Sequence, residues 1–320
     1  MKAFEVINPG VYTMLQDLGR PGYMRYGVPA SGASDRFSAQ TANLLVGNRP
    51  EAAILETALF RLELLALSNL TVAVAGGDLS PSVNKTPFPM WQAVSIQPGD
   101  RISFRGRKKG FRAFLAVRGG FSGPRYLGSR SVFSRGLMGN PLRTAEVLET
   151  EDSAVHHPFN VPLPLNLIPD FSPRPTLRVI LGPQEDRFSP KGLETFLSSE
   201  YTVSPQSDRM GYRLEGPRIE HTQGADIISE AIARGAVQVP GDGLPIIMLW
   251  DAQVSGGYTK IANVITADHD LLAQTMPGEF LRFKAVTLEE ARAALRHQEL
   301  RLADVKKVIS GWAAVSPTYP

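Results

Sequence analysis

The segment Val239–Val264 carries the densest group of side chains that could bind a small polar molecule. Its paired glycines, Gly256 and Gly257, can take positive φ and bring main-chain N–H groups close to a ligand. Amide, hydroxyl, phenol and ammonium groups flank this pair: Gln253, Ser255, Tyr258 and Lys260. Such a set of donors suits an anion or a carbonyl oxygen.

The backbone of this segment decides whether these groups can act together. Successive side chains of an extended strand point to opposite faces, so only a bend at the glycines would gather them. The competing interpretation is a hairpin whose glycines serve the turn alone, followed by a solvated Lys260. The apolar run Ile246–Trp250 should be buried, and polar groups beside a core need partners or a function. The buried apolar run beside these polar groups therefore favours a binding site over a plain hairpin.

A second group of candidates lies in sequence that is rich in turn residues. Arg20 could hold a carboxylate or phosphate through its planar guanidinium, and Asp35, in the run Gly27–Phe37, could accept a proton. Alternatively, Asp35 only supplies negative charge to a helix N-terminus and pairs with Arg20. Arg209 lies in a similar glycine-containing segment, Ser207–Arg213, and is the comparable candidate in the second half of the chain.

The composition narrows the class of protein. Among 320 residues, 34 basic and 31 acidic side chains give a net charge of only +3, which argues against nucleic acid as the main partner. There is no cysteine, so disulfides, thiolate metal sites and thiol nucleophiles are excluded, and a reducing compartment fits. The sequence has neither a signal-peptide core nor an apolar run near the roughly 18 residues of a membrane span. We expect a soluble cytoplasmic protein.

Several common ligand motifs are absent from the sequence. No G-x-x-x-x-G-K-[ST] P-loop occurs, although ATP could bind by other means, and no G-x-S-x-G nucleophile elbow occurs. The five histidines show no metal-ligand spacing. We therefore expect no metal site built by this chain.

The elements that must position the candidates are mainly short strands. Six segments bounded by turn residues have strand patterns: Leu70–Ala75, Arg101–Arg105, Arg112–Val117, Leu177–Leu181, Ala236–Val239 and Phe280–Lys284. Three helices are predicted, one after Ser34, one opened by Ser189-Pro190, and one after a capping box of Thr287 and Glu290. The last should pack against a barrel. The sequence thus predicts a mainly β fold with a few helices.

Length and a proline-rich segment predict two domains. The segment between His157 and Thr176 contains six prolines without helical or strand periodicity, as in a semi-rigid linker. We predict a first domain over residues 1–160, a linker over 161–176 and a second domain over 177–320 that includes the C-terminal helix. An internal repeat pairs Pro98–Phe104 with Pro277–Phe283 and indicates that the two domains are variants of one structural unit. The segment with Gly256 and Gly257 lies in additional sequence of the second domain.

Seven ordered blocks resemble the allophanate hydrolase subunit 2 family, also called the biotin-dependent carboxyltransferase family. They are DLGRPGY at Asp17–Tyr23, GVPASGASDRF at Gly27–Phe37, ANLLVGN at Ala42–Asn48, LGSRS at Leu127–Ser131, GPQEDRF at Gly182–Phe188, SDRMGYRLEG at Ser207–Gly216 and GGYTKIANV at Gly256–Val264. The match covers nearly the whole chain, which most resembles the C subunit of bacterial 5-oxoprolinase. The resemblance implies two cyclophilin-like β-barrel domains with the active site in the cleft between them.

The resemblance also implies a subunit of an ATP-dependent 5-oxoprolinase complex, which hydrolyses the lactam of 5-oxoproline to glutamate. The partners would be a sister protein of the subunit 1 type and a third subunit, and ATP would be used through the complex. Lys260, Arg209 and the glycine backbone would stabilise the oxyanion, with Asp35 as proton acceptor. Gln253 and Tyr258 would orient the substrate.

The sequence departs from the family pattern at one place, and two alternative functions stay open. The family usually has two threonines before the paired glycines, where this chain has Val254 and Ser255. The first alternative is transfer of a carboxyl group from carboxybiotin to urea or a similar nitrogen acceptor. The chain has no A-M-K-M-like attachment site, so another protein would carry the biotin. The second alternative is a non-catalytic regulatory partner of a subunit 1 type protein.

Overall fold

The computed structural model describes residues 1–151 and 161–315 and divides the chain into two units. Unit 1 comprises Met1–Gly19, Asp35–Asp170 and Glu299–Pro320, and unit 2 comprises Arg20–Ser34 and Phe171–Gln298. The sequence placed Arg20–Ser34 in the first domain and the whole C-terminal helix in the second, so this division differs from the expected one at both places. The boundaries at residues 160 and 177 stay a prediction.

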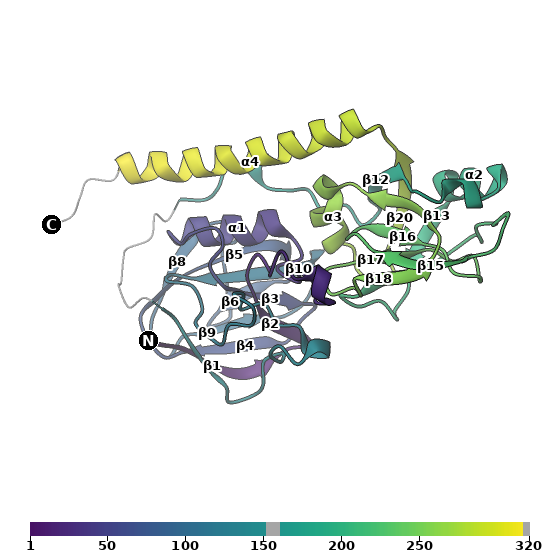
Figure 1. Ribbon diagram of the computed structural model, residues 1–320. Coiled ribbons are helices and arrows are strands. Elements are labelled where there is room, and N and C mark those ends of the chain that lie inside the picture. Colours follow the sequence, from purple (N-terminus) through teal and green to yellow (C-terminus); the bar gives the residue numbers. More distant parts are fainter. Residues whose placement is uncertain (152–160, 316–320) are drawn as a thin grey trace. The chain divides into compact units, whose positions relative to one another are not determined.

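Unit 1 is built from two antiparallel sheets (Figure 1). A six-stranded sheet has the order β11-β1-β4-β9-β6-β7, and a five-stranded sheet has the order β2-β3-β10-β5-β8. The strands are β1 (Lys2–Pro9), β2 (Tyr12–Gln16), β3 (Ile54–Ala58), β4 (Leu62–Ala66), β5 (Leu70–Asp78), β6 (Pro81–Val83), β7 (Thr86–Pro87), β8 (Ala93–Ile96), β9 (Arg101–Phe104), β10 (Lys109–Val117) and β11 (Val147–Glu149).

The core of unit 1 is formed by inward side chains from both sheets. Leu64 and Ile102 of the larger sheet and Leu55 and Leu115 of the smaller one are fully buried members of it. Helix α1 (Arg36–Leu45) packs against β5 and β10 (Figure 1). The smaller sheet is therefore covered on both faces where α1 lies, which explains why β5 and β10 read as nearly continuous apolar runs.

Unit 2 contains a closed barrel in the order β12-β19-β16-β17-β14-β13-β20 and a separate two-stranded ribbon, β15 with β18. The strands are β12 (Thr176–Leu181), β13 (Glu200–Val203), β14 (Gly211–Glu215), β15 (Asp226–Ala231), β16 (Ala236–Gln238), β17 (Ile246–Met248), β18 (Ser255–Tyr258), β19 (Lys260–Val264) and β20 (Phe280–Ala285). Alternating residues such as Tyr212 and Leu214 of β14 fill the core of the barrel.

Three further helices are α2 (Pro190–Ser198), α3 (His269–Ala273) and α4 (Leu288–Val315). Ser189 caps α2 by accepting from Gly192 N, with Pro190 in the first turn, as predicted. The predicted capping box of α4 is confirmed, because Thr287 N donates to the Glu290 carboxylate and Glu290 N donates to Thr287 Oγ1. Among the described residues, no helix has the length and apolar character needed to cross a membrane.

The mainly β class is confirmed, and so are the six predicted strands. A closed barrel forms in unit 2, whereas the strands of unit 1 form two open sheets. Both copies of the internal repeat contain a turn glycine at positive φ, Gly99 and Gly278, two residues before the first residue of a strand. Part of the predicted linker packs on unit 1, since Leu163 and Leu167 are buried there and Leu163 N donates to Trp91 O.

Candidate functional site

The paired glycines lie inside strand β18, not in a bend or a turn. Gly256 pairs with Glu230 of β15 in an antiparallel register, and neither glycine has positive φ. The expected positive φ is therefore wrong, and so is the alternative of a hairpin turn. The reason for glycine is close packing: a Cβ on Gly256 would lie 2.7 Å from Ile232 Cδ1, and one on Gly257 would lie 2.9 Å from Ile227 O.

The polar side chains beside the glycines are exposed along this extended segment. Gln253 and Ser255 are exposed, and Tyr258 is 42% exposed. Because the backbone does not bend, these three side chains are not gathered around Lys260, which is buried. Their roles in substrate binding stay a prediction.

Lys260, the first residue of β19, is held by two residues that the sequence did not single out. Its side chain is 7% exposed, and its ammonium forms an ion pair with the carboxylate of Glu230 in β15. Gln184 Nε2 donates to Glu230 Oε1 at 2.7 Å, and Gln184 Oε1 accepts from Lys260 N at 3.1 Å. These contacts fix the start of β19 to the ribbon.

Glu230 is a charged partner for this lysine. Its pKa is lowered, first by the hydrogen bond from Lys260 and then by the one from Gln184, with a further contribution from the lysine charge. The carboxylate therefore stays ionised at neutral pH. A buried ammonium needs such a counter-charge, since an isolated charge in a poorly solvated position is costly.

Gln238 is the least satisfied polar side chain at this place. It is 2% exposed, lies on β16 in register with Lys260, and its Nε2 has no hydrogen-bond partner among the described residues. The position of a Cβ on Gly256 would be 3.2 Å from this nitrogen. Leaving a buried donor unpaired costs about 1–3 kcal/mol, and this amide N–H group could donate to an acceptor such as a carbonyl oxygen.

A sequence signal for Gln238 did exist. It is the polar residue in the strand Ala236–Val239, whose other residues are apolar. Gln184 lies in the block Gly182–Phe188, but nothing in the sequence relates it to Lys260, which is far away along the chain. Only the pairing of β19 with its neighbours brings these residues together.

Arg209, which the sequence predicts as a substrate-binding residue, forms hydrogen bonds within unit 2. Its guanidinium is 3% exposed, donates from Nε to Asp251 Oδ2 at 2.8 Å, and donates from Nη2 to Gly32 O at 2.7 Å. Arg234 Nη2 donates to the neighbouring Ser31 O at 3.0 Å. Both arginines thereby hold the segment 20–34 on this unit, and a direct contact of Arg209 with substrate stays a prediction.

The two remaining candidates, Arg20 and Asp35, are both buried. Arg20 is 1% exposed, and its main-chain N donates to Ala30 O at 2.7 Å. Asp35 caps α1, because its carboxylate accepts from Ser38 N at 2.9 Å and from Ser38 Oγ at 2.6 Å. A helix begins here as expected, but its cap is Asp35 and not the predicted Ser34. The role of Asp35 as proton acceptor stays a prediction.

The arrangement as a whole is suited to a neutral or partly negative oxygen. The structure brings Lys260 and Gly256 together with Gln238, Glu230 and Gln184. Over residues 1–151 and 161–315, no group of three or more carboxylate or imidazole side chains is placed to hold a metal ion. Gln238 offers hydrogen bonding by an amide, and Lys260 offers charge stabilisation by an ammonium.

Comparison with known proteins identifies the family. A family model described as carboxyltransferase domain, subdomain A and B, matches residues 26–285. The chain is 33% identical to the C subunit of 5-oxoprolinase from Haemophilus influenzae over 92% of this chain and 95% of that protein. It is 34% identical to urea amidolyase of Lachancea kluyveri over 99% of this chain but only 19% of that protein.

The solved structures agree with this assignment. The urea carboxylase of Kluyveromyces lactis superposes with a TM-score of 0.89 and 31% identity, over 95% of this chain and 29% of that one. The chain thus matches nearly the full length of the oxoprolinase polypeptide and one portion of the larger urea enzymes. It belongs to the family of carboxyltransferase domains with subdomains A and B.

Proposed function

We propose that the chain is the C subunit of an ATP-dependent 5-oxoprolinase complex, which hydrolyses the lactam of 5-oxoproline to glutamate. The extent of the similarity carries this proposal. The 5-oxoprolinase C subunits of Haemophilus influenzae and Escherichia coli are matched over 95% of their length, whereas the urea amidolyases are matched over 17–19%. The partners would be the other subunits of the complex.

The site at Gln238 supports a lactam as ligand. Amide resonance makes the lactam carbonyl a poor electrophile, so its oxygen must be stabilised as negative charge develops. Gln238 Nε2 would donate to this oxygen, and the Lys260 ammonium would stabilise the charge. ATP would supply the activating phosphoryl group through the complex, and no nucleotide site is assigned to this chain.

Access to Gln238 would require a shift of the β15–β18 ribbon. Gly256 lies directly beside the Gln238 amide, and Ile232 packs against the same glycine. The ribbon is held there in part by the pair of Glu230 with Lys260. Glu230 is 44% exposed and can turn into water, whereas Lys260 is 7% exposed, so opening this contact should cost about 1–2 kcal/mol.

Carboxyl transfer is the second candidate, supported by the urea amidolyase of Lachancea kluyveri, to which 99% of this chain aligns. In that reaction the same donors would hold the ureido carbonyl of a carboxybiotin carried by another protein. The acceptor would be urea or a similar small nitrogen compound. Avidin would then inhibit the reaction.

The test is ATP hydrolysis by the complex copurified with its partner subunits. We expect phosphate release only with 5-oxoproline. In Gln238→Leu and Lys260→Met, we expect kcat/KM for this reaction to fall at least about tenfold, equal to about 1.4 kcal/mol of transition-state stabilisation. Lys284→Met, at an exposed position of β20, is the control and should keep activity. Full activity of both site variants would refute the site, and avidin-sensitive, urea-dependent activity would favour carboxyl transfer.

A further inference from the structure

A polar cavity of about 540 Å³ lies in unit 1 and contains none of the residues proposed above for lactam binding. Residues from three of the sequence blocks line it: Asp17–Gly19, Gly47 with Asn48, and Gly128 with Arg130. The residues that follow β10, from Arg118 to Phe121, complete the wall. Segments far apart in sequence therefore meet around one space that the proposed function does not use.

The walls of this cavity are fixed by two half-buried polar side chains, Asp17 and Asn48. The Asp17 carboxylate accepts from Ser129 Oγ and Ser131 Oγ at 2.6 Å, and from Gly19 N and Arg130 N at 2.7 Å. Asn48 Oδ1 accepts from Gly119 N, and Asn48 Nδ2 donates to Val117 O, both at 2.8 Å. The Asp17 carboxylate thus holds the loop 129–131 in place through these hydrogen bonds.

Four arginines line the cavity: Arg49, Arg118, Arg125 and Arg130. Arg118 has no carboxylate partner among the described residues: its Nη1 donates to Val46 O at 3.2 Å, and its buried Nε has no hydrogen-bond partner. Gly47 leaves room for it, since a Cβ there would lie 2.8 Å from Arg118 Nη1. Besides capping the end of α1, this guanidinium retains capacity for a ligand.

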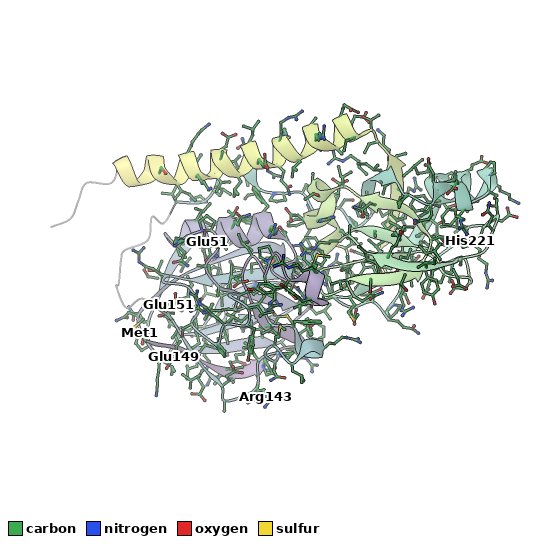
Figure 2. The ribbon with its side chains drawn as sticks, in the orientation of Figure 1. Met1, Glu51, Arg143, Glu149, Glu151 and His221 are labelled. Carbon is green, nitrogen blue, oxygen red and sulfur yellow. The ribbon has the colours of Figure 1, made fainter. Side chains whose placement is uncertain are left out.

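Two glutamates, labelled in Figure 2, neutralise the other arginines. Glu151 pairs with Arg130 and lies 3.8 Å from Arg125, while Glu51 pairs with Arg49. These carboxylates are 49% and 45% exposed, so each pair is worth only about 0–1 kcal/mol. A ligand with two negative charges could displace them into water at little cost.

We propose that this cavity binds the phosphate group of a small molecule, with Arg118 and Arg130 as its principal ligands. Guanidinium groups match phosphate oxygens in paired hydrogen bonds, and several converging arginines favour a dianion over a monoanion. Arg130 is 13% exposed, which limits competition by water. Glu151 acts as an internal competitor that occupies Arg130 until phosphate arrives. This assignment does not depend on the lactam site.

The test is calorimetric titration of the full chain with inorganic phosphate at constant ionic strength. We expect saturable binding, weakened at least about tenfold in Arg118→Met and in Arg130→Gln. Glu151→Gln should tighten binding, because it removes the competing charge. This variant changes a half-exposed side chain, so its result does not depend on the helix cap that Arg118 provides.

Arg105→Met is the matched control, since this residue lines a different cavity of unit 1, and it should leave phosphate binding unchanged. Acetate at the same concentration should bind at least about tenfold more weakly than phosphate. The proposal is overturned if the wild-type chain shows no saturable binding, if acetate binds as tightly, or if Glu151→Gln weakens binding.

Discussion

Lys260 of β19 and Glu230 of β15 form an ion pair that joins the barrel of unit 2 to its two-stranded ribbon. The lysine is nearly buried, whereas the glutamate is half-exposed, so the two partners depend on each other unequally. Loss of the glutamate leaves a buried ammonium without a counter-charge. Loss of the lysine leaves a carboxylate that water can solvate.

This asymmetry predicts that Glu230→Gln destabilises the protein more than Lys260→Met does. We expect a loss of about 1–2 kcal/mol for Glu230→Gln in urea unfolding, below the roughly 3–5 kcal/mol of a fully buried pair because Glu230 faces solvent. Adding Lys260→Met to Glu230→Gln should recover part of the loss. Glu63→Gln, which breaks a surface pair with Arg101, is the control. Additive effects in the double variant would rule out the coupling.

Gly182, at the end of β12, should tolerate no side chain. A Cβ there would lie 2.1 Å from the main-chain Lys260 O and 3.0 Å from Ala262 N, and backbone atoms cannot rotate away. We expect Gly182→Ala to lower the free energy of unfolding by about 3 kcal/mol or more. Gly241→Ala is the control, because no heavy atom lies within 4 Å of its added Cβ. Equal stabilities of the two variants would contradict this packing.

His221, labelled in Figure 2, should make the stability of the protein depend on pH. Its Nε2 lies 3.1 Å from Val239 O and 3.0 Å from Thr259 Oγ1, and its ring packs against Phe188 with centroids 4.7 Å apart. Burial lowers the pKa of His221, opposed by the hydrogen bond with Val239. The folded protein therefore favours the neutral ring.

The sign of this effect follows from linkage. With the folded pKa below the unfolded value of about 6.5, the unfolded chain binds the proton first as the pH falls. Stability is full above about pH 6.5 and decreases toward the folded pKa, by less than about 1 kcal/mol because the ring is only partly buried. His221→Gln should flatten urea-unfolding stabilities between about pH 7.5 and 5.5, whereas the exposed His297→Gln should not. If the dependence of stability on pH were unchanged in His221→Gln, His221 would not be its source.

Asp17 should be the most important single carboxylate for the loop 129–131. Asp17→Ala removes the carboxylate that accepts from the hydroxyls of Ser129 and Ser131 and from the amide of Arg130. We expect a loss of about 2–4 kcal/mol, with faster hydrogen exchange at the Arg130 amide. Asp170→Ala, which removes an exposed partner of Lys109, should change stability by less than about 0.5 kcal/mol. Slow exchange at Arg130 in Asp17→Ala would show that other contacts hold the loop.

The sequence by itself determined the features that depend on neighbouring residues. The β class, the strands, the helix caps at Ser189 and Thr287, and the turn glycines Gly99 and Gly278 all follow from local periodicity and capping chemistry. These signals act over a few residues, so they can be read along the chain. The family blocks likewise predicted the carboxyltransferase family, which the comparisons confirm.

Only the tertiary structure decided what the paired glycines do and which residues surround Lys260. A glycine that allows positive φ and one that allows a neighbouring strand to approach look identical in sequence; contacts of Gly256 with Ile232 and Gln238 distinguish them. Glu230 and Gln238 reach Lys260 through strand pairings whose register is set by packing between distant segments. The segment 20–34 belongs to unit 2 for the same reason: its partners are far away along the chain.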